Sequence, residues 1–207
     1  SVPEAAEPSN EESYIRFVFT AKEETPYCEK GHEVCFDQVK LCVGKPLAEP
    51  APETPVKVEE TAFIVSVTSG ETVFRFNKRL SAFDSIMHSG KELLDRPLSF
   101  NFFRAPVDND IMKNDWYAAH LNELTPRNYG VTVDSTPISA EIKLRQSMSW
   151  GVHQPAAYMD VTYRISGGAL DIECSAGFSN KVEMLPRFGI RAFLPRRFSH
   201  PEYRTIP

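Results

Sequence analysis

Long apolar runs, basic clusters and targeting signals are all missing from this sequence of 207 residues. No segment approaches the roughly 20 consecutive apolar residues of a membrane-spanning helix, which excludes a membrane partner. The formal net charge is -5 and no Lys/Arg cluster is dense, so nucleic acid is not expected as a partner. The opening SVPEAAEPSNEES has neither the basic start nor the apolar core of a signal peptide, and residues 1–11 are predicted to be a solvated tail.

Cysteine is also scarce, with four residues, three of them in CEKGHEVCFDQVKLC. This usage suits a reducing compartment, and we expect a cytoplasmic location. Cys28, His32 and Cys35 have a spacing that formally allows a tetrahedral zinc site, with Cys42 following. Cys35 and Cys42 alternate with apolar strand residues, however, and free cysteine packs as a small hydrophobe. We therefore predict no metal site.

Signatures of catalysis and of nucleotide binding are absent as well. The sequence contains no G-x-S-x-G, no H-E-x-x-H, no P-loop and no Rossmann glycine pattern. We predict that this chain holds no catalytic residues of its own.

What the sequence does contain is apolar residues alternating with a period of two, the pattern of half-buried strands. Strands are predicted in the segments 13–21, 34–43, 61–77, 129–135, 138–148, 158–166, 169–178 and 188–194. Segment 61–77 is predicted to be a hairpin that places Phe63, Val65 and Val67 before a turn at Ser69 and Gly70.

One segment, NDWYAAHLNEL, has a helical pattern. Asn114 or Asp115 is predicted to cap its start, while Trp116, Ala119 and Leu124 share a face. Strands without alternating helices indicate an all-β sandwich with one short helix.

A proline-rich segment separates two parts of the chain. Residues 44–58 carry four prolines, at Pro46, Pro50, Pro52 and Pro55, and proline cannot donate a ladder hydrogen bond. The segment is predicted to be an extended linker. It would join two strands in residues 12–43 to a sandwich in residues 59–207.

FFRAPVDNDI, residues 102–111, places an arginine, a proline and two aspartates around an asparagine, directly behind a pair of phenylalanines. Asp108 and Asp110 are two apart, roughly 6 to 7 Å in an extended chain, which is near the spacing of glycosidase carboxylates. The neighbouring Arg104 favours ionisation of both carboxyls, which argues against an acid and base pair. The alternatives are a hydrogen-bonded turn, with Asp108 or Asn109 accepting from backbone N–H groups, and a cation site.

FFRAPVDNDI with its Trp-led helix, and later LPRFGIRAFLP, together resemble the C-terminal β-sandwich region of glycoside hydrolase family 2 β-galactosidases. GHEVCFDQVKL resembles the last strand of the immunoglobulin-like domain before that sandwich. The resemblance runs from about Tyr14 to about Pro195. It implies that residues 12–43 end an immunoglobulin-like domain, that 44–58 link it onward, and that 59–207 begin a galactose-mutarotase-like supersandwich.

The resemblance implies a non-catalytic part of an enzyme that hydrolyses terminal β-galactosides with retention. In that family the two catalytic glutamates lie on an upstream (β/α)8 barrel, of which this chain holds nothing. The family commonly uses magnesium and sodium ions, bound mainly through residues outside this region. The implied partners are the remainder of the β-galactosidase chain and, through it, the galactoside.

The resemblance also implies roles for the polar motif. Four side chains are expected to hold the loop, namely Arg104, Asp108, Asn109 and Asp110. Four residues that follow are expected to border the substrate region, namely Met112, Lys113, Asn114 and Asp115.

Two alternatives stay open at this point. A self-sufficient carbohydrate-binding sandwich would use an exposed aromatic, Trp116 or Trp150, as a stacking platform, with His153 beside Trp150. The strand edges in residues 12–43 would also pair with another copy of the chain and give a homo-oligomer.

Overall fold

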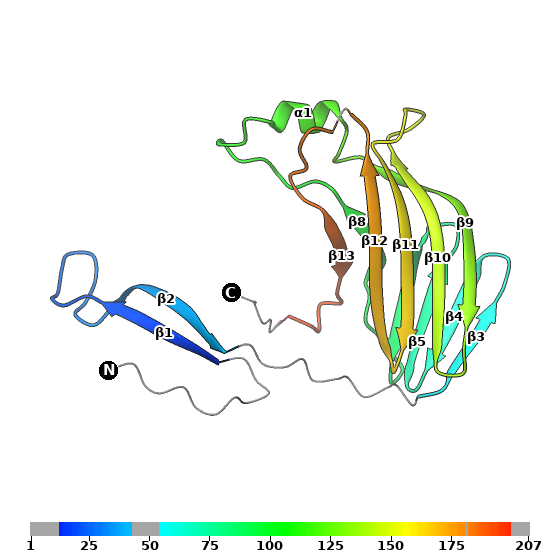
Figure 1. Cartoon of the computed structure of the whole chain (residues 1–207), viewed down its shortest axis with the longest axis horizontal. Coiled ribbons are helices and arrows are strands. Elements are labelled where there is room, and N and C mark those ends of the chain that lie inside the picture. Colours follow the sequence, from blue (N-terminus) through cyan, green and yellow to red (C-terminus); the bar gives the residue numbers. More distant parts are fainter. Residues whose placement is uncertain (1–12, 43–53, 181, 200–207) are drawn as a thin grey trace. The chain divides into compact units, whose positions relative to one another are not determined.

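The computed structural model describes residues 13–42, 54–180 and 182–199 (Figure 1). They belong to two compact units, with the division between Ala51 and Pro52. In the first unit β1 (Ser13–Thr20) pairs antiparallel with β2 (Glu33–Cys42), as predicted.

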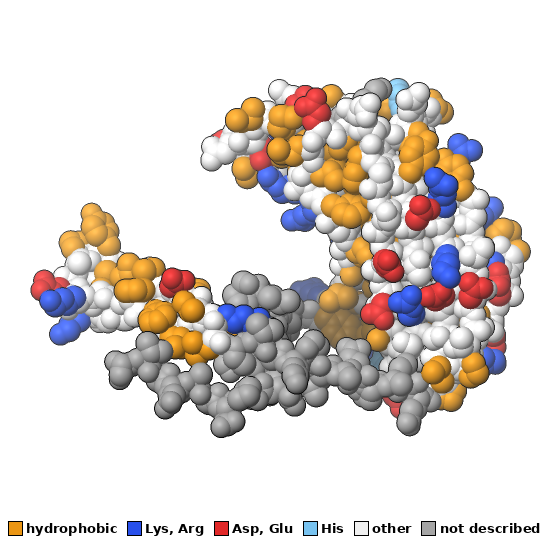
Figure 2. Space-filling model, in the orientation of Figure 1, with side chains coloured by type: hydrophobic (Ala, Val, Ile, Leu, Met, Phe, Trp, Pro, Cys, Tyr) orange, Lys and Arg blue, Asp and Glu red, His pale blue; other side chains and the backbone are white. Residues whose placement is uncertain are grey.

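The β1–β2 pair presents apolar side chains to solvent, seen as orange surface in Figure 2. Phe17, Phe19 and Phe36 are 49%, 56% and 58% exposed. Cys35 is exposed too, so the prediction that it packs as a small hydrophobe is wrong. The reason is that a two-stranded pair has no second layer of its own to bury the side chains that alternate along it. Val43, predicted to continue the second strand, lies outside the described residues.

The described residues of the second unit form three antiparallel sheets and a helix. The largest sheet has the order of its strands in the sequence: β3 (Val56–Glu60), β4 (Ile64–Ser69), β5 (Thr72–Asn77), β6 (Ala82–His88) and β7 (Lys91–Glu92). The second sheet has the order β12 (Ala169–Phe178), β11 (Ala157–Ser166), β10 (Ser139–Ser149) and β9 (Thr125–Ser135). The third pairs β13 (Gly189–Phe193) with β8 (Arg96–Asn101).

The two larger sheets pack face to face and bury one side of each strand. Val65 and Val67 on β4, and Ile142 and Ile165 on β10 and β11, have no exposed surface. The outer face of the four-stranded sheet carries mixed charges instead, visible as red and blue side chains in Figure 2. This inward and outward division makes the unit a β-sandwich.

Phe83 on β6 is the aromatic centre of this core. Its ring lies 5.3 Å from that of Phe76 and 5.1 Å from that of Tyr163, with interplanar angles of 72° and 87°. Edge-to-face contacts of this kind are favoured by the ring quadrupoles. Because Tyr163 belongs to β11, the contact joins the two sheets.

A glycine turn joins the sheets at one end. Gly167 and Gly168 connect β11 to β12 with φ values of 57° and 78°, the backbone that a two-residue type I′ hairpin needs. The Gly168 N–H donates to the Ser69 hydroxyl at 3.0 Å, and Ser69 ends β4 in the other sheet. The turn therefore also fixes the spacing of the sheets.

The predicted strands of the second unit are confirmed, including the hairpin. Its loop is Gly70–Glu71, one residue later than the predicted turn at Ser69 and Gly70, because Ser69 still pairs with Thr72 in the ladder. Four strands of this unit were not predicted, β3, β6, β7 and β8, although Leu98 and Phe100 alternate on β8. Phe63 precedes β4 and is 54% exposed, so its predicted place in the alternating face is wrong. β3 begins at Val56, within the predicted linker, because Val56 and Val58 alternate and pack against the core.

The helix α1 (Lys113–Ala118) has six residues and is shorter than the predicted segment. Its N-cap is Met112 without a side-chain cap, so the prediction of Asn114 or Asp115 at this position is wrong. Trp116 is buried, as its predicted face requires. Among the described residues no helix has the length and apolar character to cross a membrane.

The core predicts a contrast between two phenylalanines. Phe83→Ala removes a ring with 0% exposure, together with its contacts to three aromatic neighbours. The substitution should lower the free energy of unfolding by about 3 to 5 kcal/mol. Phe63→Ala is the matched control, with a cost below about 1 kcal/mol because the ring is half exposed. Urea unfolding of both variants measures the difference, and equal costs would contradict this description of the core.

Candidate functional site

The polar motif leaves the sandwich at the end of β8. Phe102 is 2% exposed and packs in the core, so the backbone is fixed at that point. The Asn101 side-chain oxygen accepts hydrogen bonds from the Phe103 N–H and from Arg191 at 2.6 Å. Arg191 belongs to β13, and the start of the loop is therefore held by both strands of the small sheet.

An ion pair between Arg104 and Asp110 closes the loop. The two guanidinium nitrogens of Arg104 donate to the two carboxylate oxygens at 2.7 and 2.6 Å, which is a bidentate arrangement. The Val107 N–H donates to the same carboxylate at 2.7 Å. The side chain of Asp110 is 13% exposed and that of Arg104 is 33% exposed. The pair is thus partly shielded from water.

These contacts lower the pKa of the Asp110 carboxyl below its ordinary value. The hydrogen bond from Arg104 is the main cause, followed by the Val107 N–H. A glycosidase acid needs a carboxyl that stays protonated near neutral pH. Asp110 is therefore unsuited to donate a proton and acts as an anchor of the backbone.

Arg104 also connects the loop to the helix. Its guanidinium carbon lies 5.3 Å from the centre of the Trp116 ring, in cation–π geometry. Trp116 is 3% exposed, and Met112 packs against its cluster. One arginine thus holds a carboxylate on one side and the buried indole on the other.

The other motif residues lie outside this anchor. Asp108 and Asn109 are exposed, and their side chains form no hydrogen bond with the described residues. The prediction that one of them caps the turn is wrong, because Asp110 accepts the backbone N–H instead. Among the residues expected to border a substrate, Asn114 and Asp115 are exposed, while Met112 and Lys113 are partly buried.

The aromatic platform required by a carbohydrate-binding module is not available at either tryptophan. Trp116 is buried, and the Trp150 ring stacks on His120 at 3.8 Å with an interplanar angle of 6°. His153 lies 4.4 Å from Trp150. The three rings contact one another beside a cavity of about 190 Å³. Sequence reasoning placed His153 near Trp150 but missed His120, which is 30 residues away in the chain.

Metal ligands do not gather in the described part of the chain. No three His, Cys, Asp or Glu side chains lie close enough there to hold an ion. Cys28 faces Thr25 across an isolated bridge, and its sulfur is 3.3 Å from the Thr25 hydroxyl.

Comparison with known proteins matches this sandwich to one family. The family described as the beta galactosidase small chain matches residues 68–205, two thirds of the chain. The chain belongs to the β-galactosidase small chain family. The matched residues begin in β4 and include the loop, the helix and all later strands.

Curated relatives carry the same name. The chain is 27% identical over 184 residues to a β-galactosidase of Actinobacillus pleuropneumoniae, a comparison that covers 86% of this chain and 18% of that protein. A β-galactosidase of Staphylococcus xylosus is 27% identical, with 84% and 18% covered. One of Lactobacillus delbrueckii subsp. bulgaricus is 25% identical, with 97% and 20% covered. The small-chain sequence thus spans about a fifth of the length of these relatives.

The anchor of the small-chain loop predicts coupling between two sites. Arg104→Met and Asp110→Asn should each lower the urea midpoint, and the double variant should lower it by clearly less than the sum, because either change already breaks the ion pair. Asp108→Asn is the matched control, since this carboxylate is exposed and unpaired among the described residues. Additive effects of Arg104→Met and Asp110→Asn would contradict the anchor.

The lowered pKa of Asp110 predicts a pH dependence. A carboxyl with a lowered folded pKa stabilises the fold above its unfolded pKa of about 3.9, and this contribution is lost as pH falls through the folded value. The urea midpoint of the native chain should therefore exceed that of Asp110→Asn at pH 7, and the gap should narrow below about pH 4. A gap of constant size from pH 7 to pH 3 would show that Asp110 is not the titrating group.

Proposed function

We propose that this chain is a non-catalytic part of a glycoside hydrolase family 2 β-galactosidase. In this proposal the whole enzyme hydrolyses terminal β-D-galactosides with retention of configuration, through a covalent glycosyl-enzyme intermediate. The observation that carries the proposal is the family match over residues 68–205, within a chain that spans about a fifth of relatives named β-galactosidase.

The proposed role of the chain is structural. The sandwich holds the loop of residues 102–112 rigidly through Arg104, Asp110 and Trp116, and leaves Ile111 92% exposed at its outer side. A rigid base with exposed side chains suits a wall of a site built from several parts of a protein. Residues Met112, Lys113, Asn114 and Asp115 are proposed to border the galactoside.

The catalytic carboxylates and the magnesium and sodium ions of such an enzyme are proposed to lie outside this region. The described residues do not fit a metal site, because no three candidate ligands come together. Asp110 is held ionised by Arg104, so this carboxyl supplies no acid. No cofactor is therefore assigned to this chain.

The proposed macromolecular partner is the remainder of the β-galactosidase. The exposed phenylalanines of β1 and β2 support this, because faces of this kind are normally buried in an interface or a core. Pairing with another copy of the chain is the alternative for the strand edges. Nucleic acid and membrane are not proposed as partners.

The proposed location is the cytoplasm. Cys28, Cys35 and Cys174 form no disulfide, which supports a reducing compartment.

The proposal predicts that the isolated 207-residue chain neither hydrolyses nor binds galactosides. Incubation with a chromogenic β-galactoside should release no product above background, and lactose should leave the indole NMR signals of Trp116 and Trp150 unchanged. Turnover that persists through repurification and is lost in Asp110→Asn would contradict the structural role. Saturable lactose binding that is lost in Trp150→Ala, with Trp150 the more exposed tryptophan, would favour the stand-alone binding module instead.

A further inference from the structure

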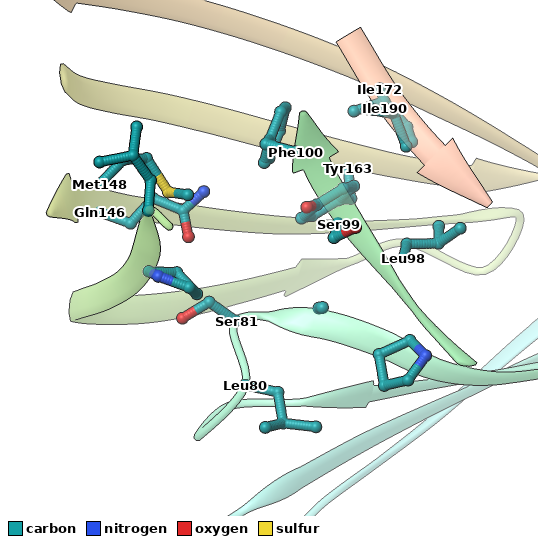
Figure 3. Close-up of a pocket in the computed structure, with 14 residues that line it drawn as sticks. Leu80, Ser81, Leu98, Ser99, Phe100, Gln146, Met148, Tyr163, Ile172 and Ile190 are labelled. Carbon is teal, nitrogen blue, oxygen red and sulfur yellow. The ribbon is translucent and has the colours of Figure 1, made fainter. Parts of the chain in front are cut away.

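A second site lies inside the sandwich, away from the polar loop. A cavity of about 190 Å³ opens between the four-stranded sheet and strands β6 and β8 (Figure 3). None of its lining side chains carries a charge. A cavity of this character excludes an ionic ligand, because an unpaired charge is costly to transfer into an apolar environment.

The walls of the cavity are mainly apolar and partly aromatic. Leu98, Phe100 and Ile190 line it from β8 and β13, while Met148 and Tyr163 line it from β10 and β11. Aromatic rings and a thioether favour another ring, through edge-to-face and sulfur–ring contacts. A cavity of about 150 Å³ with apolar walls is known to hold benzene, so this volume accommodates a single ring.

Gln146 is a polar residue at an inward-facing position of β10, where the alternating pattern predicts an apolar residue. Ala140, Ile142, Leu144 and Met148 point inward, and Gln146 lies on the same face with 1% exposure. Neither its amide nitrogen nor its amide oxygen has a hydrogen-bond partner among the described residues. Buried amides are nearly always satisfied, and leaving one unpaired destabilises a fold.

Two buried residues with hydroxyl groups line the same cavity, in addition to the exposed Ser99. Ser81 is 4% exposed, its hydroxyl is also unpartnered among the described residues, and its φ of 55° is in the left-handed region. Tyr163 is 3% exposed, and its hydroxyl makes no hydrogen bond within the described chain. Figure 3 shows Gln146, Ser81 and Tyr163 around the cavity. An amide and two hydroxyls together offer both donors and acceptors.

We propose that this cavity binds a neutral single-ring molecule that carries a hydroxyl group, of the phenol class. The ring contacts Phe100, Met148 and the other apolar walls, and the hydroxyl exchanges hydrogen bonds with the Gln146 amide. Water alone would satisfy the amide but leave the apolar walls unfilled. The site uses none of the residues assigned to the loop.

Phenol and benzene are the probes that test this site. In the native 207-residue chain, phenol should cause saturable shifts of the Gln146 side-chain amide signals and raise the melting temperature. Benzene should bind about fivefold more weakly, because it lacks the hydrogen bond. Gln146→Leu should abolish this preference and bind the two probes equally. Gln154→Leu is the matched control, since this glutamine is exposed and does not line the cavity.

Three results would overturn the proposal. The first is the absence of any saturable response to phenol in the native chain, which would leave water as the occupant. The second is equal affinity for phenol and benzene in the native chain, which remains decisive even where Gln146→Leu does not fold. The third is a phenol preference that survives in Gln146→Leu.

Discussion

Burial of alternating side chains between the two large sheets is the constraint on which the rest of this structure depends. The contact of Phe83 with Phe76 and Tyr163 joins strands that are distant in the sequence. The same core holds Phe102, the residue from which the polar loop departs. Apolar packing therefore sets the point at which the loop begins, and the polar contacts hold the residues that follow.

Arg104 holds the rest of the loop in place through two contacts. Its bidentate contact with Asp110 and its position over Trp116 act on opposite sides of one guanidinium group. A planar group that offers both hydrogen bonds and a face suits this double role, which lysine could not fill. The chemistry of the motif is thus that of an anchor, in keeping with the structural role proposed for the chain.

The core also contains a local conflict. A fully apolar inward face would have stabilised the sandwich, yet Gln146 interrupts it next to Ser81 and the Tyr163 hydroxyl. Burial raises the pKa of Tyr163, so the group remains a neutral hydroxyl that can donate and accept. A buried polar residue at a position where strand alternation predicts an apolar one tends to mark a functional site. Here Gln146 is such a residue, and it lines a cavity.

The sequence by itself determined the all-β class and most of the strands, because period-two alternation in segments such as 138–148 and 158–166 is a local property. It also pointed to the family through FFRAPVDNDI and to the burial of Trp116. Only the tertiary structure decided that Asp110, and not Asp108, pairs with Arg104, because the two aspartates are locally equivalent and differ only in the direction that the folded loop gives them. It alone placed His120 on Trp150 and Gln146 beside Ser81, since those pairs come from segments that only the packing of strands and helix brings together.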